Sequence, residues 1–173
     1  GMLMANFQAQ LRSLVNKFDS LEQLVDHLNF KLFSVTGGDR YITMFIGIYD
    51  CVNRQLRYLN AGHNPTLLHQ NGEIIVLDTG CTILGAFDAI PKISFGEIYV
   101  EENALVVCYT DGLTELENDL GEEYGIERLS EFIFKNAKLD VNEIIDNIKK
   151  DMDDFRGEQE FNDDVSILLN RFF

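Results

Sequence analysis

CxxC pairs and long apolar runs are missing from this sequence. Its three cysteines, Cys51, Cys81 and Cys108, are odd in number, which argues against a disulfide framework and against a thiolate metal site. Reduced thiols of this kind are typical of the cytoplasm, where we expect the protein. No run approaches the roughly 18 apolar residues that a membrane span needs, and no signal-peptide pattern opens the chain. Direct insertion into a membrane is therefore not expected.

Proline is also rare, with two in 173 residues, and the chain has no repeat and no low-complexity linker. A chain of this length, with 46% hydrophobic side chains, is in the usual range for one domain and can bury a real core. We therefore expect a single domain over residues 2–173. Gly1, which precedes Met2, resembles the remnant of a cleaved expression tag.

Basic residues are scarce relative to acidic ones. The chain has 14 Lys and Arg against 29 Asp and Glu, a formal net charge of -15. This balance argues against nucleic acid as a partner and against docking on an anionic membrane. Residues 97–164 alone carry 21 acidic and 6 basic side chains. Such a block is either a solvated face or a place where a few carboxylates converge on a cation.

The spacing of apolar residues predicts helices at both ends of the chain and strands between them. Leu3, Phe7, Leu11 and Leu14 recur at three- and four-residue intervals, and Ser20 is placed to cap a second helix. Runs of β-branched and aromatic residues between turn residues predict strands. The expected helices cover residues 3–18, 20–33, 126–136 and 140–155, and the expected strands cover residues 41–50, 55–61, 66–70, 73–77, 93–100, 105–109 and 165–172. This order predicts an α+β fold of layered, mostly antiparallel sheets flanked by helices.

One of the expected strands and one turn have more specific predictions. The run 41–50 has few charges, so we expect a strand buried on both faces. Asn71-Gly72 joins the strands 66–70 and 73–77, and both residues tolerate positive φ. The pair therefore predicts a two-residue hairpin turn.

Acidic residues follow or precede apolar strands at two places. Asp111-Gly112 comes directly after the strand 105–109, and Asp163-Asp164 comes directly before the strand 165–172. Each could be an ordinary exposed turn. Carboxylates held at the ends of buried strands are also the ligands that Mg²⁺ and Mn²⁺ prefer. We expect the two strands to be neighbours in one sheet and Asp111 and Asp163 to share a cation.

A third candidate is the tight turn that contains Gly62, His63 and Asn64. Gly62 and Pro65 restrict its shape, and His63 is its titratable group. The turn is either a plain connector or a place where a histidine reaches substrate. Cys108 lies inside an apolar strand and is expected to be a core residue rather than a nucleophile.

The segments "YITMFIGIYD", "LRYLNAGHNPTLL", "LVVCYTDGLTELENDLGEEYGIERL" and "FNDDVSILL" together resemble the SpoIIE-like branch of the PPM-type phosphatases. The resemblance implies a β-sandwich flanked by helices, with two Mg²⁺ or Mn²⁺ ions at one end. It implies that Asp111 and Asp163 are metal ligands and that Gly112 and Asp164 lie next to them. The residues Gly62, His63 and Asn64 would border the active site.

The resemblance also implies an activity and a partner. Members of the family hydrolyse phosphoserine or phosphothreonine on small regulatory proteins of bacterial partner-switching pathways, often antagonists of anti-sigma factors. Two alternatives remain at this point: a related phosphatase that acts on a small molecule, and a catalytically inactive binding module of the same fold.

The sequence departs from the family pattern at its start. The family carries a Gly-Asp-x-Ser-Gly-His-Gly motif, whose aspartate bridges both metals, just before a helix that resembles residues 2–14. That motif is absent, so we expect a C-terminal part of the domain without its first strands. We expect it to bind one metal ion or none and to have impaired activity, with its catalytic residues unknown. We also expect an uncovered sheet edge and an unpartnered apolar stripe on the first helix, both of which favour a homodimer.

Overall fold

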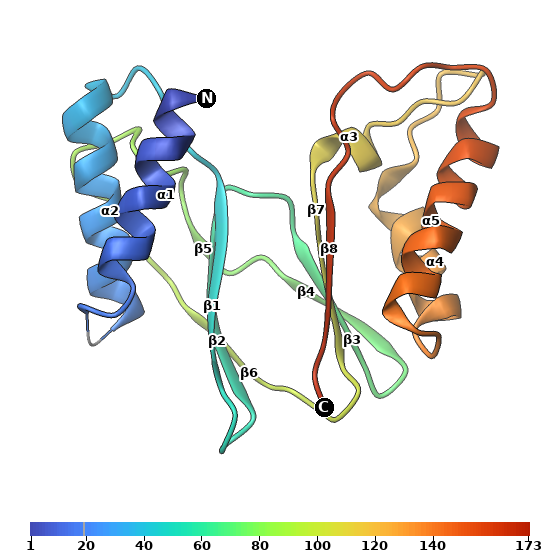
Figure 1. Cartoon of the computed structure of the whole chain (residues 1–173), viewed down its shortest axis with the longest axis horizontal. Helices are drawn as coiled ribbons and strands as arrows, with labels where there is room; N and C mark the ends of the chain where they lie inside the picture. The colour runs from blue at the N-terminus through green and yellow to red at the C-terminus, as the bar shows by residue number, and fades with distance from the viewer. Residues whose placement is uncertain (19) are drawn as a thin grey trace. The chain divides into compact units, whose positions relative to one another are not determined.

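The structure is a computed structural model that describes residues 1–18 and 20–173. It divides into two compact units, which are described separately (Figure 1). The first unit comprises residues 1–63 and 79–98, and the second comprises residues 64–78 and 99–173.

The first unit has two helices on a sheet in which β2 is the central strand. Strand β2 pairs with β1 in antiparallel fashion and with β5 in parallel, and β6 also pairs with β2. The elements are α1 (Met2–Leu14), α2 (Leu21–Thr36), β1 (Met44–Asp50), β2 (Gln55–Ala61), β5 (Gly80–Cys81) and β6 (Gly96–Tyr99).

Helix α2 has the predicted start. The backbone N–H of Gln23 donates to the Ser20 side chain over 3.2 Å, as an N-cap requires. The helix ends at Gly37, whose φ of 63° is the left-handed conformation that glycine adopts easily. Leu24, Val25 and Leu28 of this helix are buried.

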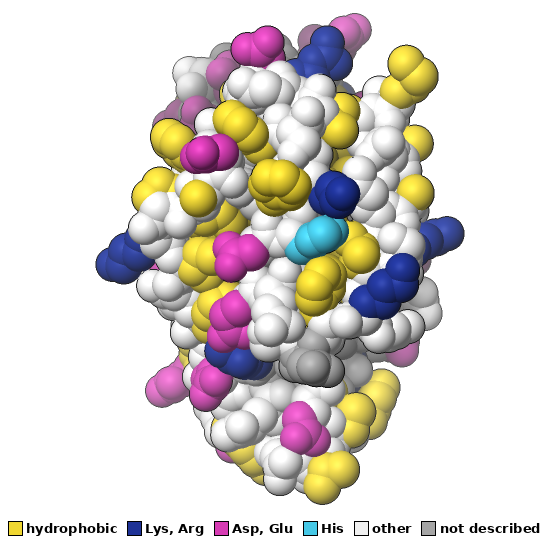
Figure 2. Space-filling model, turned by 90° about the vertical axis from the view of Figure 1, so that its left-hand side faces the viewer, with side chains coloured by type: hydrophobic (Ala, Val, Ile, Leu, Met, Phe, Trp, Pro, Cys, Tyr) yellow, Lys and Arg dark blue, Asp and Glu magenta, His cyan; other side chains and the backbone are white. Residues whose placement is uncertain are grey.

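The apolar stripe of α1 is covered within the chain. Phe7 is buried, and Leu3, Leu11 and Leu14 pack against the same cluster as the buried face of α2. The expectation of an unpartnered stripe is therefore wrong, because α2 supplies the apolar surface that α1 needs. The face of the molecule shown in Figure 2 carries apolar side chains among charged ones. The homodimer stays a prediction.

Strand β1 differs from its prediction. Within the described residues it pairs only with β2, and it begins at Met44 rather than at Tyr41. Ile48 is 53% exposed, and no residue of β1 is fully buried. The prediction of a strand buried on both faces is wrong, because an apolar composition also suits a strand at the margin of a sheet.

The second unit packs helices on one antiparallel sheet with the strand order β4-β3-β7-β8. Asn71 and Gly72 have φ angles of 52° and 75°, which confirms the predicted hairpin turn between β3 and β4. The elements are β3 (Thr66–Gln70), β4 (Glu73–Leu77), β7 (Leu105–Tyr109), α3 (Asp111–Thr114), α4 (Gly125–Asn136), α5 (Val141–Arg156) and β8 (Ile167–Arg171).

The core of the second unit lies between its sheet and the helices α4 and α5. Leu129 and Ile133 of α4 and Ile144 and Ile148 of α5 are buried in one cluster with strand residues such as Val107. Asp140 and Glu143 form a complete capping box at the start of α5. This core holds β7 and β8, whose ends carry the acidic segments.

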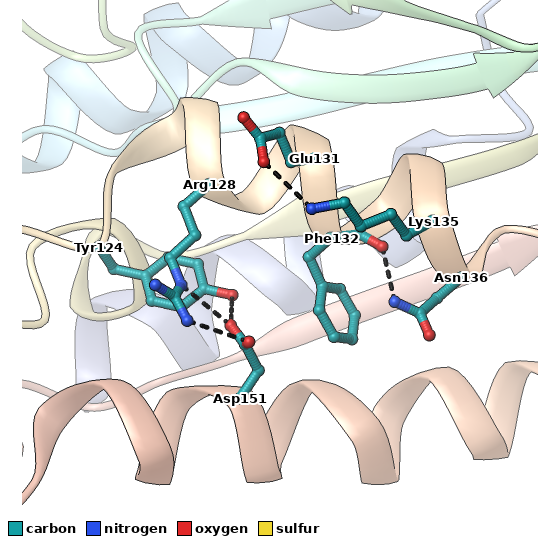
Figure 3. Close-up of polar contacts among 7 residues, drawn as sticks. All are labelled: Tyr124, Arg128, Glu131, Phe132, Lys135, Asn136 and Asp151. Atoms are coloured by element: carbon teal, nitrogen blue, oxygen red, sulfur yellow. Dashed lines mark hydrogen bonds and ion pairs between the residues drawn. The ribbon is translucent and has the colours of Figure 1, made fainter.

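A polar network joins α4 to α5 beside this core (Figure 3). The buried Tyr124 hydroxyl donates to Asp151 Oδ2 over 2.6 Å, and Arg128 donates to both Asp151 oxygens over 3.1 Å each. Burial raises the pKa of the Asp151 carboxyl, but hydrogen bonds from Arg128 and Tyr124 and the charges of Arg128 and Lys135 outweigh it and lower that pKa. Burial raises the pKa of the Tyr124 hydroxyl, and its hydrogen bond to Asp151 and the charge of that carboxylate raise it further.

We expect Asp151→Asn to lower the free energy of unfolding by about 1–2 kcal/mol at neutral pH. A carboxyl with a lowered folded-state pKa stabilises the fold above its unfolded pKa of about 3.9, and this contribution is lost as the pH falls through the folded value. The difference between wild type and variant should therefore shrink in acid. Urea unfolding at several pH values measures it, and a difference that is constant down to acid pH would contradict the assignment.

Candidate active site

The two acidic segments leave the second sheet side by side. Strands β7 and β8 pair in antiparallel register with Tyr109 opposite Ile167, so the residue after β7 meets the residue before β8. The backbone N–H of Thr110 donates to the carbonyl of Ser166 over 3.0 Å. The prediction that these strands are neighbours in one sheet is confirmed.

Thr110 ties the two segments together with its side chain. Its hydroxyl donates to the carbonyl of Asp164 over 3.0 Å and accepts from the backbone N–H of Ser166 over 2.9 Å. Sequence reasoning missed this residue. The available signal was a threonine just before the aspartate, since short hydroxyl side chains readily bond to nearby backbone groups.

Gly112 lets the backbones of the segments approach each other. A Cβ atom at this position would lie 2.7 Å from the carbonyl oxygen of Asp164 and 3.2 Å from that of Asp163. Both neighbours are backbone atoms, so no side-chain rotation would make room. Glycine is required here by close packing, which agrees with a position next to the expected ligands.

Local backbone bonds orient the two candidate carboxylates. Asp111 Oδ1 accepts the N–H of Gly112 over 3.0 Å, and Asp163 Oδ1 accepts the N–H of Asp164 over 2.7 Å. All three aspartates are exposed. In the described part of the chain, no group of three or more His, Cys, Asp or Glu side chains is placed to hold a metal ion. Mg²⁺, however, usually keeps several waters and takes only one or two carboxylates besides a substrate phosphate.

The turn around His63 is shaped by the buried Asn60. The Asn60 side chain accepts from the His63 N–H over 2.7 Å and donates to the His63 carbonyl over 2.9 Å. Gly62 has a φ of 65°, and a Cβ there would collide with Ile83. Asn60 is a second residue that sequence reasoning missed.

The imidazole of His63 lies near one hydroxyl. Its Nδ1 is 3.4 Å from Thr43 Oγ1. Gly62 and His63 belong to the first unit, whereas Asn64 and the aspartates belong to the second, so each set is described within its own unit. The position of this turn at the active site stays a prediction.

Neither Cys81 nor Cys108 is suited to nucleophilic attack. Burial raises the pKa of the Cys108 thiol, and its Sγ lies 3.4 Å from Thr66 Oγ1. Burial, with a smaller contribution from Asp26, raises the pKa of Cys81 to about 11. Nucleophilic thiols need a lowered pKa.

Across residues 1–18 and 20–173, none of the helices combines the length and apolar character needed to cross a membrane.

Comparison with known proteins identifies relatives of this chain. The family model "Stage II sporulation protein E (SpoIIE)" matches residues 1–173. Protein IcfG of Synechocystis sp. is 30% identical over 137 residues, which are 76% of this chain and 21% of that protein. The chain thus spans about a fifth of this relative.

Solved structures share the fold. The SiaA-PP2C domain of Pseudomonas aeruginosa matches with a TM-score of 0.82 at 17% identity. The match covers 99% of this chain and 68% of the SiaA chain. The PP2C phosphatase domain of SpoIIE from Bacillus subtilis, with a fragment of its regulatory domain, has a TM-score of 0.80 at 16% identity, covering 99% of this chain and 50% of its own. The RsbU and RsbW domains of Rv1364c from Mycobacterium tuberculosis give 0.76 at 22% identity, covering 99% and 47%.

These likenesses confirm the predicted fold class, an α+β fold with two mostly antiparallel sheets like that of the PPM phosphatases. Because the SpoIIE family model matches residues 1–173, the chain belongs to the SpoIIE family and has the fold of the PPM-type phosphatases.

Proposed function

We propose that this chain takes part in metal-dependent hydrolysis of phosphoserine or phosphothreonine on a regulatory protein. The observation that supports it best is the close packing of Asp111-Gly112 on the backbone of Asp163-Asp164. Residues 52 positions apart meet there at the ends of two neighbouring strands, with a glycine where no side chain fits.

Asp111 and Asp163 would hold one Mg²⁺ or Mn²⁺ ion, with water in the other positions. When bound, such an ion supplies a water of lowered pKa and positive charge for a phosphate. The protein's own contribution is orientation. Thr110 fixes the spacing of the two segments, and the N–H groups of Gly112 and Asp164 fix one oxygen of each carboxylate.

The partner we propose is a phosphorylated protein of the anti-sigma-factor-antagonist type. The support is the family's role in partner-switching pathways, together with a structural relative in which an RsbU domain accompanies an RsbW domain. The free cysteines Cys51, Cys81 and Cys108 agree with a cytoplasmic location.

The metal site is tested by Mn²⁺ binding to the 173-residue chain, measured from the EPR signal of free Mn²⁺. Asp111→Asn and Asp163→Asn should each weaken binding about tenfold, since each removes a charged ligand. Asp146→Asn, which removes the same charge from an exposed position on α5, should leave it nearly unchanged.

Activity gives the second readout. Any turnover of p-nitrophenyl phosphate should be lost in both Asp111→Asn and Asp163→Asn. Unchanged Mn²⁺ affinity in both variants would contradict the proposed site. Tight binding of a phosphoprotein without hydrolysis would favour the alternative, a binding module.

A further inference from the structure

A groove of about 540 Å³ begins at the candidate metal ligand Asp163 and runs along α5 within the second unit. Its size is in the range of ligand-binding pockets, roughly 300–1,000 Å³. Asp163 and Asp164 line it together with residues of α5 and of the chain leading into β8. Its apolar lining consists of Ile145, Ile148, Met152, Phe161, Val165 and Ile167.

The floor and one wall of the groove are held in place. Ile148 and Met152 are buried in the core of the unit, so this part of the groove rests on well-packed side chains. The wall is Phe161, which is 46% exposed and lies under the Arg156 guanidinium, 5.0 Å from the ring centre.

Arg156 also fixes the loop that carries Phe161. Its Nη1 donates to the carbonyl of Gln159 over 2.5 Å, and its Nε donates to Asp153 over 2.9 Å. The Gln159 side chain donates to Asp119 over 3.0 Å, which attaches the same loop to the segment after α3. Because these bonds already fix the loop, Phe161 loses little conformational freedom when a ligand binds.

The charged lining indicates what the groove could hold. Lys149 lines it, and its ion pair with Asp146, at 3.9 Å, is exposed and therefore weak. Lys149 is thus available to a negatively charged group. The groove therefore combines three features. Asp163 and Asp164 are suited to a metal-held phosphate, Lys149 complements the charge of that phosphate, and the apolar lining lies beside them.

We propose that this groove binds an apolar side chain of the phosphoprotein substrate, close to its phosphorylated residue, with Phe161 as the residue that sets this preference. The proposal rests on the proposed function, because Asp163 ties the groove to the phosphate site. A substrate with leucine or a similar side chain at that position would be favoured over one with alanine.

Binding of fluorescent peptides to the 173-residue chain in Mn²⁺ tests this, measured by anisotropy. Each peptide has phosphoserine in an otherwise alanine sequence with one leucine at a different position, and an all-alanine phosphopeptide is the reference. Leucine at one or two adjacent positions should tighten binding about tenfold, as expected for burial of one large apolar side chain. Phe161→Ala should reduce that ratio to near one.

Phe134→Ala is the matched control, because Phe134 is a similarly exposed phenylalanine (54%) on α4 that does not line the groove. It should keep the leucine preference. A preference that is absent, or that survives Phe161→Ala, would overturn the proposal. So would self-association of the chain that Phe161→Ala abolishes, which would assign the groove to a second copy.

Unphosphorylated peptides and Asp111→Asn separate this proposal from the proposed function. If only the metal-site proposal fails, affinity will not depend on the phosphate or on Asp111, yet the leucine preference and its loss in Phe161→Ala will remain. If only the groove proposal fails, phosphate dependence will remain without a leucine preference.

Discussion

Replacing Gly112 with alanine should weaken Mn²⁺ binding about tenfold, as much as Asp111→Asn or Asp163→Asn. The added Cβ would lie 2.7 Å from the Asp164 carbonyl oxygen and 3.1 Å from its carbon. To relieve these close contacts, the backbone after Asp111 must move away from the backbone of Asp163-Asp164. The two candidate ligands would then separate, although neither has been changed.

The fold should survive Gly112→Ala, because α3 contributes only Leu113 to the cluster between the second sheet and α4 and α5. Thr114→Ala is the control: Thr114 lies in the same short helix, and its hydroxyl donates within that helix to the Asp111 carbonyl over 3.3 Å. EPR titration of Mn²⁺ and a thermal melt measure the two quantities. Wild-type Mn²⁺ affinity in a folded Gly112→Ala variant would contradict the packing argument.

Gly80→Ala should destabilise the first unit by at least about 3 kcal/mol, near the top of the range for single substitutions. Gly80 pairs with Asn60 across β5 and β2, and a Cβ would overlap the Asn60 carbonyl group. The two strands would have to part. Because the Asn60 side chain also holds His63 through two bonds, the turn should lose its shape as well.

Gly72→Ala is the matched comparison for this change. A Cβ at Gly72 meets no atom within 4 Å, and its only penalty is a φ of 75°, which costs about 1–2 kcal/mol. Urea unfolding gives both free energies, and the NMR signals of the His63 ring report on the turn. Equal destabilisation by the two variants, with the His63 signals unmoved, would show that β5 tolerates a side chain.

Much of the fold could be predicted because local signals coincide with tertiary structure. The bounds of β2, β3, β4 and β7 match their predictions, since turn residues stand at their ends. The start of α5 was equally predictable, because Asp140 and Glu143 form a capping box from local sequence alone.

What could not be predicted depends on contacts distant in sequence. The exposure of β1 depends on how much of the chain packs against its two faces, which an apolar run does not reveal. Strand β5 is two residues long and is defined by its pairing with β2, in which Gly80 lies opposite Asn60 and Cys81 opposite Ala61. Helix α3 is a single turn that starts at Asp111 itself.

The candidate site was partly predictable for the same reason. Asp111 and Asp163 stand at strand ends where an acidic residue is conspicuous. Thr110 and Asn60 act through bonds to backbone groups that become neighbours only after folding, or after a tight turn has formed.

The proposed function requires that Asp111 and Asp163 together hold a divalent cation. Paramagnetic broadening of backbone amide NMR signals by substoichiometric Mn²⁺ tests it most directly, because the effect falls steeply with distance from the ion and requires no turnover. The amides of Asp111, Gly112, Asp163 and Asp164 should broaden first and together, and Asp111→Asn should abolish this. Broadening that begins at other acidic residues, such as those of the loop 115–123, or that spreads evenly over the acidic surface, would contradict the claim.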